Sequence, residues 1–177
     1  MNELKFRTLK ADEIECRIGT IKKDGSGLSL LLYKDARCDM DLLDETVGMM
    51  NWKREHLRDN ANCVVSIYDP EKKEWVSKED TGSESNTEAN KGLASDSFKR
   101  ACFNWGIGRE LYSAPFIWVS KEKCEIKAGM NGKFQCYDKF RVSNIHYDEN
   151  RCIDGLVIIN DKTNQIVYSL MPKGIKK

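Results

Sequence analysis

The stretch that decides the fold is GLASDSFKRACFNWGIGR, residues 92–109. Within it, Ala94, Phe98, Ala101 and Trp105 recur three or four positions apart. Residues with this spacing lie on one face of a helix, so the stretch has an apolar side and a polar side. It therefore predicts an amphipathic helix that packs on the core of the molecule.

The expected ends of this helix come from its flanking residues. Asn86 or Thr87 can act as the N-cap, because both side chains accept hydrogen bonds from free backbone N–H groups. We expect the helix to start near Thr87 and to stop at the glycine pair Gly106 and Gly108.

Two cations leave the apolar side of this helix next to each other. Lys99 and Arg100 are held on a rigid element, which positions phosphate contacts better than a loop does. A charged pair beside a buried stripe is also typical of an ordinary solvated helix surface. The pattern alone favours that second interpretation.

The same stretch resembles the single-strand annealing recombinases of the Rad-fifty-two type, especially their phage relatives known as Sak proteins. Their hallmark is a helix (small)-x-(S/T)-D-(small)-(L/F)-K-R-A, followed by an aromatic residue, G-I-G-R and another aromatic residue. Here it reads ASDSFKRA at residues 94–101 and WGIGRELY at residues 105–112. A weaker match comprises YKDAR at residues 33–37, a helix-like segment over residues 39–47, Gly48 and Trp52. The resemblance covers roughly residues 10–115.

This resemblance implies an α+β fold with a β-β-β-α unit, in which an antiparallel three-stranded meander packs on the long helix. In the family, the hairpin and helix frame a groove on the outside of a ring of identical subunits. We expect residues 1–115 to form this core, with residues 116–177 as a C-terminal β-rich extension of the same domain.

The remaining patterns predict shorter elements. Apolar spacing indicates a short helix over residues 9–18, a strand covered on both faces over 28–33 and a helix over 39–47. Strands are expected at residues 51–58, 62–68 and 74–79 before the long helix. After Pro115 we expect a strand at 116–119, a charged loop over 121–133, and a β-meander with strands at 135–147, 152–159 and 165–170.

The resemblance gives Lys99 and Arg100 the role of binding the DNA backbone. Arg37 lies at, or within one residue of, the upstream groove arginine of the family. The alternative for Arg37 is a surface salt bridge with Asp35 or Asp39.

The chain departs from the family pattern at two positions. Phe103 stands where relatives carry a third basic residue, and Met49 where an aromatic is common. Basic residues on the first hairpin strand could compensate: alternation places Arg54 and Arg58 on the side of Trp52, and Lys53 on the opposite side. Their alternative role is the solvated side of a hairpin. These candidates are Lys53, Arg54 and Arg58.

Aromatic residues offer a second kind of contact, because bases of single-stranded DNA stack on exposed rings. Trp105 belongs to the apolar stripe and Trp52 matches a structural tryptophan of the family. Trp75, at the hairpin edge, is the stacking candidate. Arg109 either bonds the carbonyls at the end of the helix or touches a neighbouring subunit.

Composition limits the remaining possibilities. The formal net charge of the 177 residues is +1, so any basic surface must be local. No apolar run is long enough for a membrane span, and the N-terminus lacks a secretion signal. The seven cysteines include no Cys-x-x-Cys pair and fit reduced thiols of the cytoplasm. A zinc site from Cys124, Cys136, Cys152 and His146 is a disfavoured alternative.

We therefore expect a protein that binds single-stranded DNA and anneals complementary strands in recombination and repair. It would act without ATP, cofactor or metal, as a homo-oligomeric ring or filament, and not as an enzyme. Its expected partners are single-stranded DNA, further copies of itself and a single-stranded-DNA-binding protein. Its expected location is the cytoplasm of a bacterial host, encoded by a phage or prophage. The alternatives are a metal-dependent nuclease and an RNA-binding module.

Overall fold

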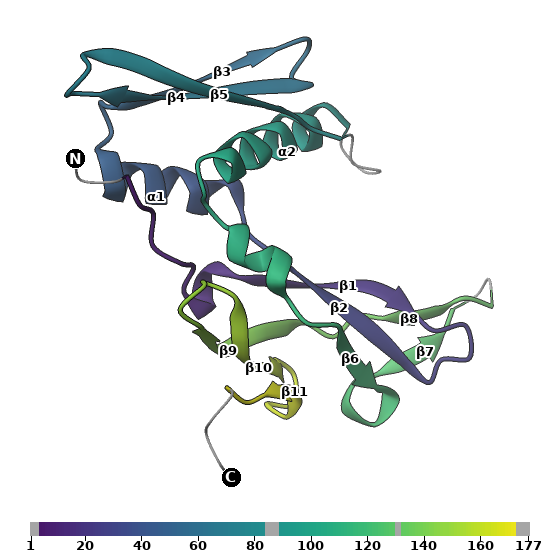
Figure 1. The fold of residues 1–177 in the computed structure, drawn as a ribbon. Coiled ribbons are helices and arrows are strands. Elements are labelled where there is room, and N and C mark those ends of the chain that lie inside the picture. Colours follow the sequence, from purple (N-terminus) through teal and green to yellow (C-terminus); the bar gives the residue numbers. More distant parts are fainter. Residues whose placement is uncertain (1–3, 84–88, 130–131, 173–177) are drawn as a thin grey trace. The chain divides into compact units, whose positions relative to one another are not determined.

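The structure is a computed structural model that describes residues 4–83, 89–129 and 132–172. The described residues form two α-helices and eleven β-strands, with neighbouring strands antiparallel (Figure 1). This confirms the predicted α+β class with its C-terminal β-meander. The predicted cap at Asn86 or Thr87 lies outside the described residues.

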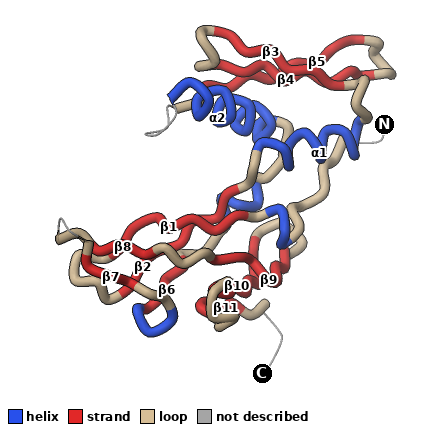
Figure 2. Tube along the Cα trace, turned by 180° about the vertical axis from the view of Figure 1, so that it is seen from behind, coloured by secondary structure: helices blue, strands red, loops and turns tan. Residues whose placement is uncertain are grey.

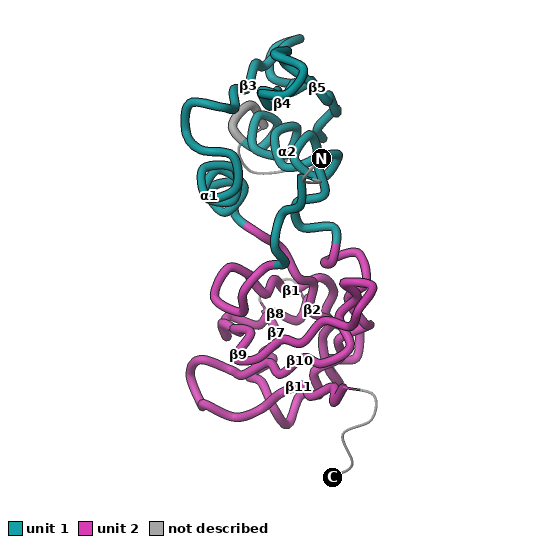
Figure 3. The backbone as a smooth tube through the Cα atoms, turned by 60° about the vertical axis from the view of Figure 1, so that its left-hand side comes forward, with its two compact units in different colours: residues 1–8, 35–109 teal, residues 9–34, 110–177 magenta. Residues whose placement is uncertain are grey.

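The chain divides into two compact units (Figure 3). Unit 1 comprises Met1–Thr8 and Asp35–Arg109, and unit 2 comprises Leu9–Lys34 and Glu110–Lys177. The chain therefore crosses between the units three times, and each unit is built from separate sequence segments.

Unit 1 contains a three-stranded antiparallel sheet in the order β3-β4-β5, and helix α2 runs along one face of it (Figures 1 and 2). The second helix, α1, ends at Gly48, just before the sheet begins. The bounds are α1 Ala36–Val47, β3 Trp52–Leu57, β4 Asn62–Asp69, β5 Glu74–Thr81 and α2 Ala89–Asn104. The predicted β-β-β-α order is confirmed.

The core of unit 1 lies between α2 and the central strand. Val65 and Ile67 of β4 are buried, as are Phe98, Ala101 and Cys102 of α2. Removing such side chains from water is the main favourable contribution to folding, about 25 cal/mol per Å² of apolar surface. The predicted apolar stripe is thus present at Phe98 and Ala101.

Helix α2 ends where the sequence predicted. The last helical residue is Asn104, and Gly106 follows with φ = 98°, a left-handed conformation that side chains disfavour. Trp105 is only half-buried, and its Nε1 donates to the Val65 carbonyl at 3.0 Å. Trp105 therefore anchors the end of the helix to β4 by a hydrogen bond as well as by packing.

Two polar residues of the hallmark motif hold the middle of α2 in place. The Asp96 carboxylate accepts hydrogen bonds from the backbone N–H of Ser83 at 2.8 Å and from its hydroxyl at 3.1 Å. The Ser97 hydroxyl is fully buried and donates to the carbonyls of Asn60 at 3.0 Å and Ala94 at 3.2 Å. Asp96 and Ser97 thus attach the helix to the segment after β5 and to the β3–β4 turn.

Unit 2 contains a six-stranded antiparallel sheet in the order β11-β10-β9-β1-β2-β6. The N-terminal hairpin therefore pairs with the C-terminal meander through β1 and β9. One face is the core of the unit, with Leu30, Val119, Phe140 and Ile158 buried. The bounds are β1 Glu15–Ile21, β2 Gly27–Tyr33, β6 Ile117–Ser120, β9 Phe140–Tyr147, β10 Ile153–Asn160 and β11 Ile166–Leu170; a separate pair is β7 Ile126–Ala128 and β8 Phe134–Cys136.

Several predicted elements of unit 2 are wrong. Residues 9–18 form a 3₁₀ turn (Ala11–Glu13) followed by strand β1, because Leu9 and Ile14 enter the core from either side of that turn. The expected loop 121–133 contains the 3₁₀ turn Lys121–Lys123 and strand β7, and the expected strand 135–147 is split into β8 and β9.

The strand predicted at residues 28–33 exists but is not covered on both faces. Leu28 and Leu30 are buried, whereas Leu31 and Tyr33 are 47% and 37% exposed. An unbroken apolar run indicates two-sided burial only when both faces have partners. Here the described residues leave one face open.

Candidate nucleic-acid interface

Arg37 pairs with the carboxylate of Asp35, and Lys99 is near enough for its charge to act on the same group. Asp35 caps α1: its Oδ1 accepts from the Arg37 backbone N–H at 2.7 Å, and its Oδ2 pairs with Arg37 Nη2 at 3.2 Å. The hydrogen bonds from Arg37 lower the pKa of Asp35, and the positive charge of nearby Lys99 lowers it further. The start of α1 and the middle of α2 therefore bring two predicted DNA contacts to one place.

Arg100 lies with a different set of neighbours from Lys99. Its Nε is 3.3 Å from Oδ1 of Asp80 on β5, and its side chain is 48% exposed. Successive helix residues point about 100° apart, which explains why Lys99 lies near α1 and Arg100 near β5. The two adjacent cations therefore have different neighbours in the structure.

Arg54 of β3 contacts α2 at Phe98, one residue before Lys99. Its guanidinium lies 4.6 Å from the ring centroid of Phe98, the residue that precedes Lys99. The other neighbour of Phe98 is Trp52, whose Nε1 donates to Asp44 at 2.6 Å and whose ring stacks on Phe98. Trp52 is thus structural, as expected, and we call Arg37, Arg54 and Lys99 the cation group.

Arg58 does not share the strand face of Arg54. Strand β3 ends at Leu57, and Arg58 lies in the following turn with φ = 51°. The turn continues through Asp59 and Asn60, both also with positive φ. Arg58 is exposed at this turn, so the predicted common face holds for Trp52 and Arg54 only.

Lys53 and Trp75 lie on the opposite face of the sheet, as alternation predicts for Lys53. The Lys53 ammonium is 4.6 Å from the Trp75 ring centroid, and Tyr68 packs against the same tryptophan at 5.5 Å. Trp75 is 42% exposed. The seven predicted DNA-binding residues therefore lie in separate groups and not along one continuous surface strip.

Arg109 takes the first of its two predicted roles. Its Nε and Nη2 donate to the carbonyls of Phe103 at 2.8 Å and Asn104 at 2.9 Å, at the C-terminal end of α2. A cation at this end also balances the negative pole of the helix. The Arg109 guanidinium lies 5.4 Å from the Phe103 ring centroid, so a positive charge stands beside the position where relatives carry a basic residue.

Lys78 is a cation that the sequence analysis missed. It lies 4.6 Å from the Trp105 ring centroid and donates to the Asn104 carbonyl at 2.8 Å. Alternation along β5 could have predicted its position, because Lys78 and Asp80 lie on the strand face that packs against α2.

The cysteines are free thiols, and burial makes several of them weaker acids than an ordinary thiol. Burial raises the pKa of Cys16 and Cys124 to about 12 and that of Cys63 to about 11. Nucleophilic attack and metal binding require the thiolate. At neutral pH these three side chains therefore act as small apolar groups.

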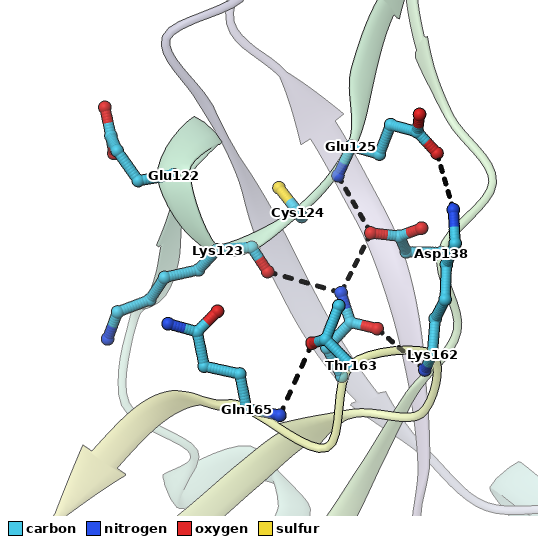
Figure 4. Close-up of a pocket in the computed structure, with 9 residues that line it drawn as sticks. Glu122, Lys123, Cys124, Glu125, Asp138, Lys162, Thr163 and Gln165 are labelled. Atoms are coloured by element: carbon cyan, nitrogen blue, oxygen red, sulfur yellow. Dashed lines mark hydrogen bonds and ion pairs between the residues drawn. The ribbon is translucent and has the colours of Figure 1, made fainter.

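A polar pocket in unit 2 shows how the β10–β11 turn is held (Figure 4). Oδ2 of Asp138 accepts from the Glu125 backbone N–H and from the Asn160 amide, both at 2.8 Å. Lys162 Nζ donates to Glu125 at 2.7 Å; hydrogen bonds from Lys127 and Lys162 lower the pKa of Glu125 to about 2. These side chains bind one another, which indicates a structural network.

The zinc alternative fails on placement. His146 pairs with Asp154 at 2.5 Å. Among the residues that the structure describes, no three His, Cys, Asp or Glu side chains are grouped so as to hold a metal ion. The set Cys124, Cys136, Cys152 and His146 is therefore not assembled.

One comparison with known proteins gives a match. Residues 56–128 match the model of the Rad52/22 family double-strand break repair protein. The matched stretch runs from β3 through the whole described part of α2 to β7. The predicted resemblance to Rad-fifty-two-type annealing proteins is thus confirmed over these residues, while Arg37 and the upstream motif lie outside the match.

No curated protein and no solved structure matches the chain. Among the described residues, neither α-helix has the length and apolar character that crossing a membrane requires.

Proposed function

We propose that this chain binds single-stranded DNA and promotes the annealing of complementary strands in recombination and repair, as a homo-oligomer and without ATP. The family match over residues 56–128 supports DNA repair as the general role. The Sak-type relationship, the ring or filament, the cytoplasmic location in a bacterial host and a single-stranded-DNA-binding protein as partner are further parts of this proposal.

One observation carries the proposal: Arg37 pairs with Asp35 at 3.2 Å, and Lys99 of α2 is near enough for its charge to lower the pKa of the same carboxyl. Two cations from different helices near one point can contact neighbouring phosphates, although a phosphate must compete with Asp35 for Arg37. Arg54 extends this cation group along β3, where it lies on the Phe98 ring.

Annealing requires that the protein bind the strands, but it requires no covalent chemistry. A protein that holds two strands extended, with their bases exposed, leaves base pairing to supply the free energy. Cations along a groove and stacking rings are sufficient for this kind of binding. Lys53, Arg58, Arg100 and Trp75 are proposed as additional contacts outside the cation group.

The decisive experiment follows annealing of two complementary labelled oligonucleotides in EDTA without ATP. We expect faster annealing than in buffer alone, and full-length products when magnesium is added. Shortened products that depend on magnesium would instead show the alternative nuclease, and preference for duplex RNA over single-stranded DNA in competition would show the RNA-binding module.

A double variant tests the residues. Lys99→Ala with Arg100→Ala is expected to stay folded and to lose most of its affinity for single-stranded DNA, with a flatter dependence on salt, because fewer counterions are released on binding. The matched control is Lys127→Ala, which removes an exposed cation of unit 2 that pairs with Glu125. Normal affinity of the double variant would contradict the proposed role of these cations.

A further inference from the structure

An exposed aromatic surface lies on unit 2, on the side of the six-stranded sheet that faces away from its core. Phe116 is 77% exposed, Trp118 38%, Leu31 47% and Tyr33 37%. Ser29 of β2 is paired with Trp118 of β6, so their side chains lie on the same side of the sheet. Because side chains alternate along a strand, Leu31 and Tyr33 lie on that side with Ser29, and Phe116 lies there with Trp118. We call Leu31, Tyr33, Phe116 and Trp118 the aromatic face.

Two rings of this face contact each other, and one of them is packed on the sheet. Phe116 and Trp118 stack with ring centroids 6.4 Å apart and planes 19° apart. Trp118 also lies against the backbone of Gly27: a Cβ at that glycine would be 2.3 Å from Cζ2 of the indole. Because Trp118 is already packed on Gly27, stacking a base on it costs little side-chain entropy.

A cation completes the aromatic face. Arg17 of β1 is opposite Leu31 in the register, and its guanidinium lies 5.0 Å from the Tyr33 ring centroid. It also pairs with Glu15 at 2.8 Å while its side chain remains 57% exposed. The face thus combines three aromatic rings with one accessible guanidinium.

This combination fits nucleobases better than an aliphatic protein surface. Flat rings on a sheet bind unstacked bases by stacking, and a guanidinium contacts a neighbouring phosphate or stacks on a further base. The Arg17 charge complements phosphate, which competes with Glu15 for it, and all three rings are at least partly exposed.

We propose that the aromatic face of unit 2 is a second contact surface for single-stranded nucleic acid, which holds bases by stacking on Phe116 and Trp118. This rests on the proposed function but uses residues of the other unit. Stacking releases few counterions, so its contribution to affinity depends little on salt, unlike that of the cation group.

The test uses the full chain and a single-stranded oligonucleotide that carries 5-iodouracil, which crosslinks to aromatic side chains on irradiation. We expect an adduct on the peptide that contains residues 116–118. Phe116→Leu and Trp118→Leu are expected to weaken binding roughly tenfold each, within the range known for loss of one stacked base. The slope of affinity against salt should not change.

Tyr137→Leu is the matched control, because Tyr137 is an exposed aromatic residue of the same unit (80%) outside the aromatic face. It should bind like the unaltered protein. Thermal unfolding of each variant separates loss of binding from loss of folding, and the crosslink on the unaltered protein tests the surface even where a variant does not fold.

Two results would overturn the inference while the proposed function stands. One is normal affinity of both leucine variants, with no adduct at residues 116–118, in a protein whose binding still depends on Lys99. The other is a smaller native assembly for the leucine variants with unchanged affinity per subunit, which would show that the aromatic face contacts a second copy. Absence of any DNA binding by the unaltered protein would instead refute the proposed function.

Discussion

The adjacent cations Lys99 and Arg100 have different partners, so they should contribute unequally to DNA binding. Arg100 is already engaged by Asp80 at 3.3 Å, and a phosphate must compete with that carboxylate. Lys99 lies with Arg37, from a second helix, near Asp35. The sequence alone could not distinguish them, because their partners come from segments far apart in the chain.

We therefore predict that Lys99→Ala weakens binding of single-stranded DNA more than Arg100→Ala does. Lys99→Ala should also reduce the slope of log affinity against log salt by about 1, as expected for one lost phosphate contact. Fluorescence anisotropy with a labelled oligonucleotide at several salt concentrations measures both quantities. Equal losses for the two variants would contradict the different environments of these side chains.

A second single residue, His56, makes the stability of the folded protein depend on pH. Burial lowers the pKa of His56, and the positive charge of Arg54 lowers it further. The unfolded chain then binds more protons than the folded chain below about pH 6.5, the ordinary histidine value. The stabilising contribution of neutral His56 is therefore complete above that pH and is lost as the pH falls below it.

We predict a lower free energy of unfolding at pH 5.5 than at pH 7.5, measured by urea unfolding. His56→Gln should reduce this difference, because glutamine does not titrate. The window avoids the described carboxylates with lowered pKa values, such as Asp35 and Glu125, which titrate at lower pH. An unchanged difference in the glutamine variant would show that another group is responsible.

At the scale of elements, the position of α2 depends on polar contacts as well as on its apolar stripe. Asp96 accepts two hydrogen bonds from Ser83, and buried Ser97 donates to the Asn60 carbonyl. These contacts give the aspartate and the small hydroxyl residue of the motif a structural role. They orient the helix that carries Lys99.

Asp96→Ala is expected to lower the free energy of unfolding by about 1–2 kcal/mol, because two hydrogen bonds to a charged group are lost. Asp96→Asn, which keeps an acceptor oxygen, should lose less. Urea unfolding of the three proteins measures the order, and DNA affinity at a temperature where all are folded should stay close to normal. If the alanine variant were as stable as the unaltered protein, Asp96 would not contribute to holding α2 in place.

The elements that the sequence predicted well are those with local signals. Helix α2 has a helical apolar period and a glycine at its end, and β3, β4 and β5 are separated by short turns. Strand β1 was missed because Leu9 and Ile14 have helix-like spacing although they flank a turn. The exposed side of β2 was missed because an apolar run does not show which face has a partner.

At the scale of the whole molecule, unit 1 offers a physical basis for the proposed self-association. Its sheet order β3-β4-β5 makes β3 and β5 edge strands, and most residues of both are exposed. Edge strands present backbone groups that pair with another chain. The exposed charges differ in balance: β3 carries Lys53, Arg54 and Glu55, and β5 carries Glu74, Lys78 and Glu79. A contact between β3 of one copy and β5 of the next is head-to-tail, and repetition of such a contact yields a ring or a filament.

Native mass spectrometry is expected to show multimers both with and without a single-stranded oligonucleotide. Glu74→Lys should shift the distribution towards smaller species, because it places a positive charge opposite the basic edge of the next copy. Glu122→Lys makes the same charge change at an exposed site of unit 2 and should leave the distribution unchanged. If Glu74→Lys left the assembly intact, the contact would lie elsewhere. A monomer under all conditions would contradict self-association itself, and annealing would then have to be explained by a single chain.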